Sequence, residues 1–251
     1  MTASPTSRTV LVTGAAGGMC AGINQRLAAA GHTVLCADLH LEAAQAAADR
    51  LDAQGYPSAG YALDVTDDAS VQALWDAVTA DGHAVEVLVN AAGILDRKFM
   101  EDTSSESFRL ALEINLEGPF RLIRAFSPAM VEAGWGRIIN ISSIAGVTGY
   151  PYPSYAASKA GLSNLTRSLT VDLRRTGVTI NSICPGVVDT PMVIQAVRDE
   201  VERKVPTGKI IDPEEIGALA AFLVSDDARS INGADLLIDG GATRVYQLIE
   251  D

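Results

Sequence analysis

The sequence predicts an α/β fold: one doubly wound parallel sheet with helices on both faces. Short apolar segments of strand length alternate with longer helix-like segments along all 251 residues, as expected of a parallel sheet. The first of these strands runs directly into a glycine-rich turn and an apolar helix, the order that begins a βαβ unit. With 48% hydrophobic residues, the chain can bury the core of one large domain.

The elements follow one another with short connections. Residues 9–12 form a continuous apolar run, typical of a strand buried on both faces. Further strands are expected at residues 33–37, 59–63, 85–89, 137–141, 178–183 and 236–239. Helices are expected from the glycine turn to about residue 30 and at residues 41–54, 68–80, 105–132, 155–176 and 213–224. Gly177 would end the helix at 155–176, because glycine readily adopts the left-handed conformation found there.

No linker, repeat or low-complexity tract divides the chain. We therefore expect a single domain over residues 8–251, behind a disordered lead at residues 1–7. No apolar segment has the length of a membrane span, and the first residues lack the apolar core of a signal peptide. The sequence favours a cytoplasmic protein with no membrane partner.

Charge and cysteine content exclude several other classes of function. The formal net charge of −12 would repel a polyanion, so nucleic acid is not an expected partner. Cys20, Cys36 and Cys184 show no CxxC spacing, which argues against both a disulfide framework and a zinc site. The three histidines are far apart in sequence, so no metal is expected. A small-molecule substrate remains the best expectation.

Tyr155 and Lys159 are spaced i, i+4, so on a helix they lie on the same face. A phenol has an ordinary pKa of about 10, too high for proton transfer at neutral pH. A fixed ammonium beside it favours the phenolate and lowers that pKa, which makes a usable general acid or base. Pairs of this kind also occur on ordinary surface helices, so the other motifs decide the interpretation.

The glycine-rich turn predicts a dinucleotide site. Gly14, Gly17 and Gly18 precede a helix, where backbone N–H groups can approach a pyrophosphate closely. Asp38 ends the second strand, where a carboxylate can accept hydrogen bonds from the adenosine ribose and would repel a 2′-phosphate. No Arg or Lys lies in the turn or in residues 38–41. NAD is therefore expected rather than NADP.

Taken together, these segments resemble the short-chain dehydrogenase/reductase family over nearly the whole chain. The TGxxxGxG motif of that family corresponds to residues 13–20, with Cys20 in place of its third glycine. The NNAG motif corresponds to residues 90–93, with Ala91 in place of the second asparagine. The resemblance identifies Tyr155 and Lys159 as the family's YxxxK motif, Ser142 as its catalytic serine and Asn115 as its helix asparagine.

The resemblance implies a Rossmann fold and the interconversion of a secondary alcohol and its ketone. Tyr155 would transfer the proton, and Lys159 would bind the nicotinamide ribose and lower the pKa of Tyr155. Ser142 would donate to the substrate oxygen, and Asn115 would hold a water that links Lys159 to solvent. The implied cofactor-binding residues are Gly14, Gly17, Gly18, Met19, Asp38, Leu39, Asp64, Val65, Asn90, Ala91, Ala92, Tyr155, Lys159, Pro185, Gly186, Val188 and Thr190.

In this family the substrate lies beside the segments that correspond to residues 94–97, 145–153 and 192–195. Val147, Tyr150, Tyr152 and Met192 suggest a moderately apolar pocket there, with Asp96 and Arg97 as solvated loop charges. A secondary alcohol fits best, and a polyol or sugar acid remains open.

Two alternatives to this function are a 3-oxoacyl-[acyl-carrier protein] reductase, which would prefer NADPH, and a non-catalytic NAD-binding scaffold. Asp38 argues against the first, and the presence of Ser142, Tyr155 and Lys159 argues against the second. Members of the family are usually homotetramers or dimers. A homotetramer here would pack residues 105–132 and 155–176 against their symmetry mates.

Cys20 suggests a further hypothesis. A thiol near a helix N-terminus tends to have a lowered pKa and to be oxidisable, so its oxidation would weaken NAD binding. A quiet, buried cysteine is the commoner situation. Gly22 is expected to compensate for the missing third glycine by easing contact between the helix and a strand.

Overall fold

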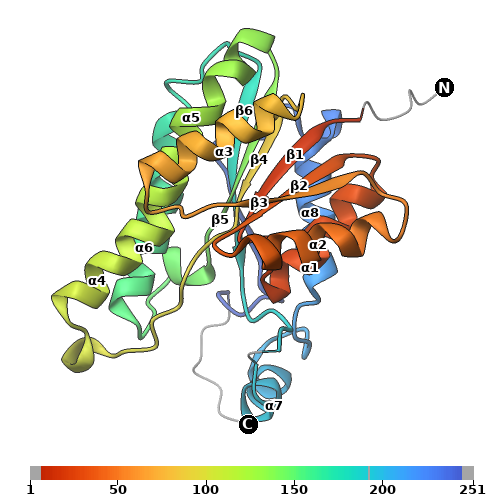
Figure 1. Cartoon of the computed structure of the whole chain (residues 1–251). Coiled ribbons are helices and arrows are strands. Elements are labelled where there is room, and N and C mark those ends of the chain that lie inside the picture. The colour runs from red at the N-terminus through yellow and green to blue at the C-terminus, as the bar shows by residue number, and fades with distance from the viewer. Residues whose placement is uncertain (1–6, 192, 245–251) are drawn as a thin grey trace.

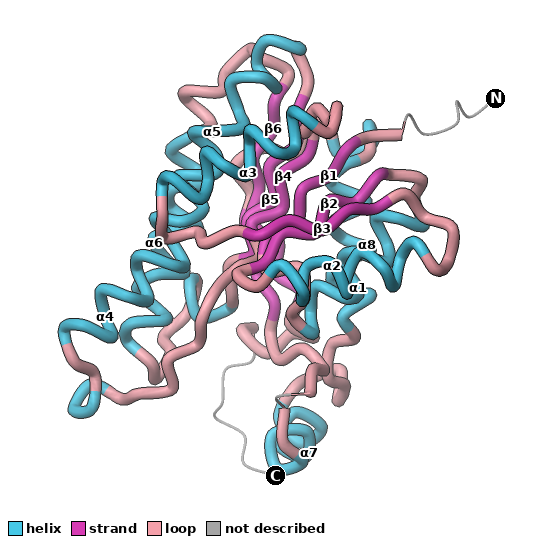
Figure 2. The backbone as a smooth tube through the Cα atoms, viewed as in Figure 1, coloured by secondary structure: helices cyan, strands magenta, loops and turns pink. Residues whose placement is uncertain are grey.

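A computed structural model of the chain describes residues 7–191 and 193–244. Seven parallel strands form one sheet in the order β3-β2-β1-β4-β5-β6-β7 (Figure 2). They are β1 (Thr9–Thr13), β2 (Thr33–Asp38), β3 (Ser58–Ala62), β4 (Val87–Asn90), β5 (Gly136–Ile141), β6 (Val178–Pro185) and β7 (Asp235–Ile238). The predicted doubly wound parallel sheet is confirmed. Residues 1–6 of the expected disordered lead lie outside the described residues.

Helices cover both faces of the sheet (Figure 1). The helices on one face are α1 (Gly18–Ala29), α2 (Leu41–Asp52) and α8 (Pro213–Val224). Those on the other face are α3 (Asp68–Ala80), α5 (Gly118–Ala133) and α6 (Pro153–Leu169). The helix α4 (Ser105–Leu112) precedes α5, while α7 (Gln195–Lys204) stands apart from both layers.

The core consists of two apolar layers, one on each side of the sheet. Successive side chains of a strand point to opposite faces, and β1 shows the consequence directly. Val10 and Val12 pack with Ile23 of α1, whereas Leu11 packs with Leu122 of α5. All five side chains are fully buried. The continuous apolar run of this strand is therefore explained by burial on both faces.

Two long helices differ from their predicted extents. The predicted helix at 105–132 is interrupted by a π-helical turn, Glu113–Glu117, between α4 and α5. The predicted helix at 155–176 begins at Pro153, whose fixed φ suits the first turn, and ends at Leu169. The chain tightens after the last turn of this helix, because the N–H groups of Thr170 and Val171 donate to the carbonyl oxygens three residues earlier in the chain.

Gly177 does have the predicted left-handed conformation, with φ of +82°, although the helix ends before it. A Cβ at this position would lie 2.0 Å from the carbonyl oxygen of Gly134. Gly177 is therefore needed for the close approach of two loops as well as for its backbone angle.

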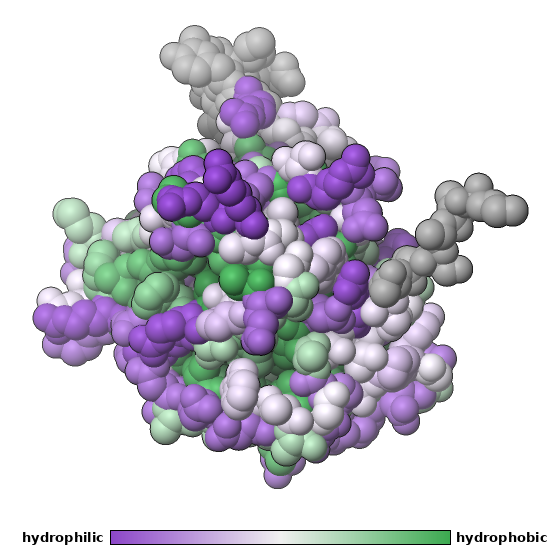
Figure 3. Space-filling view, turned by 90° about the horizontal axis from the view of Figure 1, so that it is seen from above, coloured by the Kyte–Doolittle hydropathy of each residue, from purple (hydrophilic) through white to green (hydrophobic). Residues whose placement is uncertain are grey.

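The surface mixes polar and apolar residues, and hydrophobic side chains gather in patches on the face seen in Figure 3. Within the described residues, no helix combines the length and the hydrophobicity that crossing a membrane requires.

Candidate active site

The sequence motifs meet at the carboxyl ends of the strands. Gly14 follows β1, Asp38 ends β2, Ala91 follows β4, Ser142 follows β5 and Gly186 follows β6. The strand order reverses between β1 and β4, and ligands bind at such a switch point in open parallel sheets. The fold therefore brings together motifs that are far apart in the sequence.

The glycine turn is shaped by a close approach between two loops. Gly14 has φ of +64°, and a Cβ on it would lie 2.8 Å from the Cα of Ala92. Thr13 holds the second loop in place, since its Oγ1 accepts hydrogen bonds from the N–H groups of Ala91 and Ala92, both at 3.1 Å. Behind this turn α1 begins at Gly18, and its N-cap residue, Gly17, provides no side-chain hydrogen bond. Its first backbone N–H groups are thus available to an anion such as a pyrophosphate.

Two carboxylates flank the glycine turn. Asp38 Oδ2 accepts from the N–H of Ala16 at 3.0 Å, and Oδ1 accepts from the N–H of Leu39 at 2.9 Å. Asp64 Oδ1 accepts from the N–H and the hydroxyl of Thr66, and these bonds hold the pKa of Asp64 below its ordinary value. Both carboxylates line the same hollow as the glycine turn. Ionised oxygens in this position suit the hydroxyl and amino donors of an adenosine.

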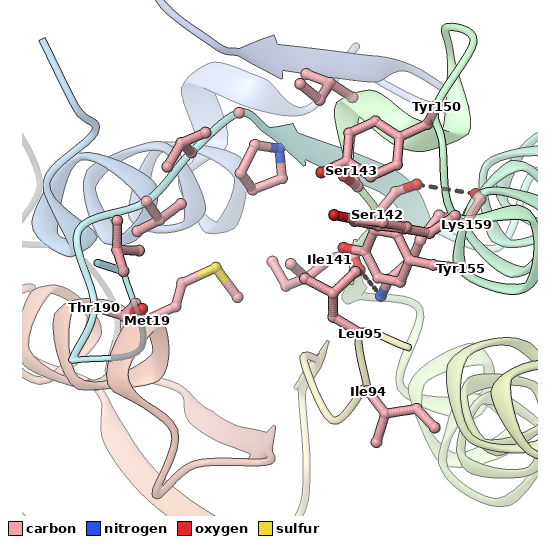
Figure 4. A pocket seen from close by; sticks show the side chains of 18 of the residues that line it. Met19, Ile94, Leu95, Ile141, Ser142, Ser143, Tyr150, Tyr155, Lys159 and Thr190 are labelled. Atoms are coloured by element: carbon pink, nitrogen blue, oxygen red, sulfur yellow. Dashed lines mark hydrogen bonds between the residues drawn. The ribbon is translucent and has the colours of Figure 1, made fainter. Parts of the chain in front are cut away.

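This hollow adjoins a second one of about 410 Å³ that reaches the Tyr155–Lys159 pair. The residues that line both are Met19, Ala91, Gly93, Ile94 and Thr190. Figure 4 shows Met19 and Thr190 on one side of the second hollow, with Tyr150 and Tyr155 on the other. The two hollows together provide room for an extended ligand between Asp38 and Tyr155.

Tyr155 and Lys159 share one face of α6, as predicted. The Lys159 ammonium lies 5.8 Å from the centre of the Tyr155 ring and donates to the carbonyl oxygen of Ile141 at 2.8 Å (Figure 4). Burial lowers the pKa of Lys159 to about 8. Burial also raises the pKa of Tyr155, so the prediction that this pKa is lowered is wrong for this structure. Removal from water is the largest effect, and the Lys159 ammonium is directed at a carbonyl rather than at the phenol.

The two adjacent serines after β5 have different surroundings. The Ser142 hydroxyl donates to the carbonyl oxygen of Lys159 at 3.0 Å and lies 2.9 Å from the Ser163 hydroxyl. A hydroxyl has one proton, and that of Ser142 is used inside the protein. The Ser143 side chain instead interacts with Tyr155, which partly offsets the effect of burial on the Tyr155 pKa. This geometry points to Ser143 as the donor to a substrate, and the catalytic role expected of Ser142 stays a prediction.

Asn115 lies in the π-helical turn and is fully buried. Its Oδ1 accepts from the N–H of Ile94 at 2.8 Å, and its Nδ2 donates to the carbonyl oxygen of Ile94 and to the Ser158 hydroxyl, both at 2.9 Å. A Cβ on Gly93 would lie 2.9 Å from Asn115 Oδ1 and 3.4 Å from the Lys159 ammonium. Asn115 therefore fixes the loop beside Lys159, and its predicted water-holding role stays a prediction.

The structure separates Asn90 from the other predicted cofactor-binding residues. The rest of that set lines one or both hollows, but Asn90 lines neither. Its side chain is buried and donates from Nδ2 to Oδ1 of Asn140 at 2.8 Å. It joins β4 to β5 beneath the site, and its predicted contact with the cofactor stays a prediction.

The substrate side of the second hollow is only partly as expected. Tyr150 and Tyr152 line it, Val147 does not, and Met192 lies outside the described residues. Val197 of α7 was not predicted to line it, because its distance along the chain from the motifs gives no sign of the contact. Arg97 is exposed, as expected of a solvated loop charge, and it is also among the lining residues.

The two departures at the start of α1 are explained by packing. Cys20 is 2% exposed, and burial raises the pKa of its thiol to about 12, so the hypothesis of an acidic, oxidisable thiol is wrong. A Cβ at Gly22 would lie 2.2 Å from the carbonyl carbon of Pro213. Gly22 therefore allows α1 to pack closely against α8, rather than against a strand as expected.

Hydride exchange with a nicotinamide ring requires a groove that holds the dinucleotide and a proton donor at the nicotinamide end of that groove. The carboxyl ends of the strands provide both the groove and the donor. The fold and the site thus define a nicotinamide-dependent oxidoreductase. A family model described as enoyl-(acyl carrier protein) reductase matches residues 14–243. These features and the comparisons below show that the chain belongs to the short-chain dehydrogenase/reductase family.

Several proteins are similar to this chain over nearly its full length. D-threitol dehydrogenase of Mycolicibacterium smegmatis is 39% identical over 241 residues, which cover 94% of this chain and 93% of that protein. Trans-4-hydroxycyclohexanecarboxylate dehydrogenase of Sinomonas cyclohexanicum is 39% identical over 251 residues, with 97% and 96% covered. The crystal structure of a gluconate 5-dehydrogenase from Burkholderia cenocepacia with NADP and tartrate has a TM-score of 0.91 and 29% identity, with 96% and 98% covered. The predicted exchange between a secondary alcohol and its ketone agrees with these relatives.

Proposed function

We propose that the protein is an NAD-dependent dehydrogenase that interconverts a secondary alcohol and its ketone. The observation that carries the proposal is the position of Tyr155, which is beside Lys159 on α6 and faces a hollow continuous with the glycine turn. A buried phenol at this point can exchange a proton with a substrate oxygen.

The residues that line the first hollow fit the adenosine end of the cofactor. The α1 terminus would bind the pyrophosphate, Asp38 the ribose and Asp64 the adenine amino group. NAD is favoured because none of the described residues that line this hollow is Arg or Lys, and Asp38 would repel a 2′-phosphate. The Burkholderia cenocepacia structure contains NADP, so the preference of this chain rests on its own Asp38.

Each residue of the second hollow has a separate role. Tyr155 would take the proton of the alcohol during oxidation and return it during ketone reduction. We assign to Ser143, in place of Ser142, the hydrogen bond to the substrate oxygen, which stabilises the charge that develops there. Lys159 would bind the nicotinamide ribose, and Asn115 would support it through the loop at Gly93. When bound, the nicotinamide supplies the hydride acceptor or donor and a positive ring that favours the Tyr155 phenolate.

A second candidate is a 3-oxoacyl-[acyl-carrier protein] reductase, since the matching family model is described as an acyl-carrier-protein reductase. Such an enzyme would use NADPH, which Asp38 disfavours.

A homotetramer would bury apolar side chains that are exposed on α4 and α5, among them Leu110, Phe120 and Val131. The three cysteines are free and buried, which suits a cytoplasmic location.

The test is an oxidation assay with NAD⁺ and NADP⁺ over a panel of secondary alcohols, polyols and hydroxy acids. We expect turnover with NAD⁺ to exceed that with NADP⁺, and Asp38→Ser to shift this ratio toward NADP⁺ by roughly 10- to 100-fold. NAD⁺ binding without turnover of any alcohol would instead support the non-catalytic scaffold. Faster turnover with NADPH and 3-oxoacyl thioesters would support the acyl-carrier-protein reductase.

A further inference from the structure

We propose that the substrate is a hydroxy acid and that Arg97 binds its carboxylate. This inference rests on the proposed function and adds the chemical class of the substrate. It concerns a residue that the sequence alone indicated to be a solvated loop charge.

The charges around the second hollow favour an anion. Its lining contains Arg97 and Lys159, and none of the described residues that line it is Asp or Glu. The Lys159 ammonium is buried against the Ile141 carbonyl, behind the Tyr155 ring. Arg97 is exposed at the mouth of the hollow and is therefore the cation that a substrate can reach.

Arg97 also keeps its charge available. Among the described residues it forms no ion pair, because the neighbouring Asp96 is paired with Lys98, with 3.6 Å between Asp96 Oδ1 and the Lys98 ammonium. A guanidinium presents several N–H donors in a planar arrangement that matches a carboxylate. This geometry favours a carboxylate over a neutral hydroxyl group as its partner.

Arg97 lines the same hollow as Tyr150 and the reacting group, Tyr155. Burial raises the pKa of Tyr150, and the positive charge of Arg97 opposes that effect. The Tyr150 ring is 6.1 Å from the Tyr155 ring. An anion held by Arg97 would therefore lie in the same hollow as the residue that exchanges the proton.

Part of the wall of this hollow is aromatic. The rings of Tyr150 and Tyr152, which both line it, are 5.6 Å apart. Phe99, outside the lining, meets Tyr152 edge to face at the same distance. Such a wall suits the carbon skeleton between the hydroxyl and the carboxylate of a hydroxy acid. Since the whole chain carries a net charge of −12, an anionic substrate also needs a local cation of this kind.

The experiment compares matched substrates in matched variants. Each hydroxy acid of the panel, including cis- and trans-4-hydroxycyclohexanecarboxylate and gluconate, is assayed with NAD⁺ beside its neutral carboxamide. We expect the acid to be preferred in kcat/KM, and Arg97→Gln to lower the acid-to-amide ratio by about 10- to 100-fold, mainly through KM. Arg97→Lys should retain part of the preference, and Lys209→Gln, which removes an exposed positive charge outside the lining and leaves the Asp96–Lys98 pair in place, should leave the ratio unchanged.

The outcomes separate this inference from the proposed function. Turnover of neutral alcohols with no preference for acids, or an equal ratio in wild type and Arg97→Gln, would overturn the role of Arg97 and leave the dehydrogenase intact. An equal fall in the ratio for Lys209→Gln would also overturn it, because a general effect of positive charge would then suffice. Absence of turnover with every alcohol and acid would refute the proposed function itself.

Discussion

The Ser142 hydroxyl donates a hydrogen bond to the backbone carbonyl of Lys159 at 3.0 Å, which ties the end of β5 to the middle of α6. Ser163, one turn further along α6, lies 2.9 Å from the same hydroxyl. Ser142 thus holds the helix that carries Tyr155 and Lys159 against the sheet. The neighbouring Ser143 contacts Tyr155 itself.

These two contacts predict different consequences for the two serines. Ser143→Ala should lower kcat by about 10- to 1,000-fold with little change in stability, because it removes a donor to the developing oxyanion. Ser142→Ala should lower the free energy of unfolding by about 1–3 kcal/mol, because it leaves buried partners unsatisfied. Steady-state kinetics and denaturant unfolding of both variants measure the two effects. A larger loss of kcat in Ser142→Ala than in Ser143→Ala would restore Ser142 as the donor.

Tyr155→Phe should retain cofactor binding and lose turnover. The substitution keeps the ring that lines the hollow and removes only the hydroxyl, so kcat should fall by about 10²- to 10⁴-fold. Fluorescence titration with NADH measures the binding, and single-turnover kinetics measure the chemical step. A variant with near-normal kcat would show that another group exchanges the proton.

The reaction should depend on pH in opposite ways for its two directions. Burial raises the pKa of Tyr155, so the phenol is protonated at neutral pH. Alcohol oxidation needs the phenolate and should rise by up to tenfold for each pH unit below the Tyr155 pKa in the complex, whereas ketone reduction needs the phenol and should fall above that pKa. Profiles of kcat/KM between about pH 6 and 10 test this sign. Parallel profiles for the two directions would contradict it.

The sequence predicted most of the fold because the relevant signals are local. Alternating apolar segments specify buried strands and helices. Gly14 follows a strand, Asp38 ends one, and the Tyr155–Lys159 pair shares a helix face. The π-helical turn around Asn115 was not predictable, since the apolar pattern continues through it.

Contacts made across the fold were beyond the reach of sequence patterns. Ser142 and Ser143 are adjacent and chemically identical, and only the position of α6 distinguishes them. The sign of the Tyr155 pKa shift depends on burial, which two residues at i and i+4 do not reveal. Arg97 lines the hollow through the loop that follows β4, a placement that its neighbours in the sequence do not reveal.

Cys20 should be unreactive in the folded protein. Its thiol is 2% exposed, and burial raises its pKa to about 12, so the thiolate that reacts with peroxide is scarce at neutral pH. Mild peroxide should therefore leave the affinity for NADH unchanged, and iodoacetamide should label Cys20 only after unfolding. Mass spectrometry of the labelled peptide measures this. Rapid labelling in the native state would show that α1 opens to solvent.

Gly22→Ala should destabilise the protein at the contact between α1 and α8. The added Cβ would lie 2.2 Å from the carbonyl carbon of Pro213 and 2.3 Å from its oxygen, and backbone atoms cannot rotate out of the way. The helices must separate, which should cost about 2–4 kcal/mol of unfolding free energy, more than the roughly 1 kcal/mol that alanine contributes to helix stability.

Gly161→Ala in α6 is the matched control for that substitution. There the added Cβ would lie 2.8 Å from Cδ2 of Leu116, the end of a side chain that can change rotamer. We expect its free energy of unfolding to change by less than about 1 kcal/mol, because the gain in helix propensity offsets the small rearrangement. Urea unfolding of both variants decides the point. Equal stabilities would mean that α1 and α8 adjust to one another more readily than their backbone contact indicates.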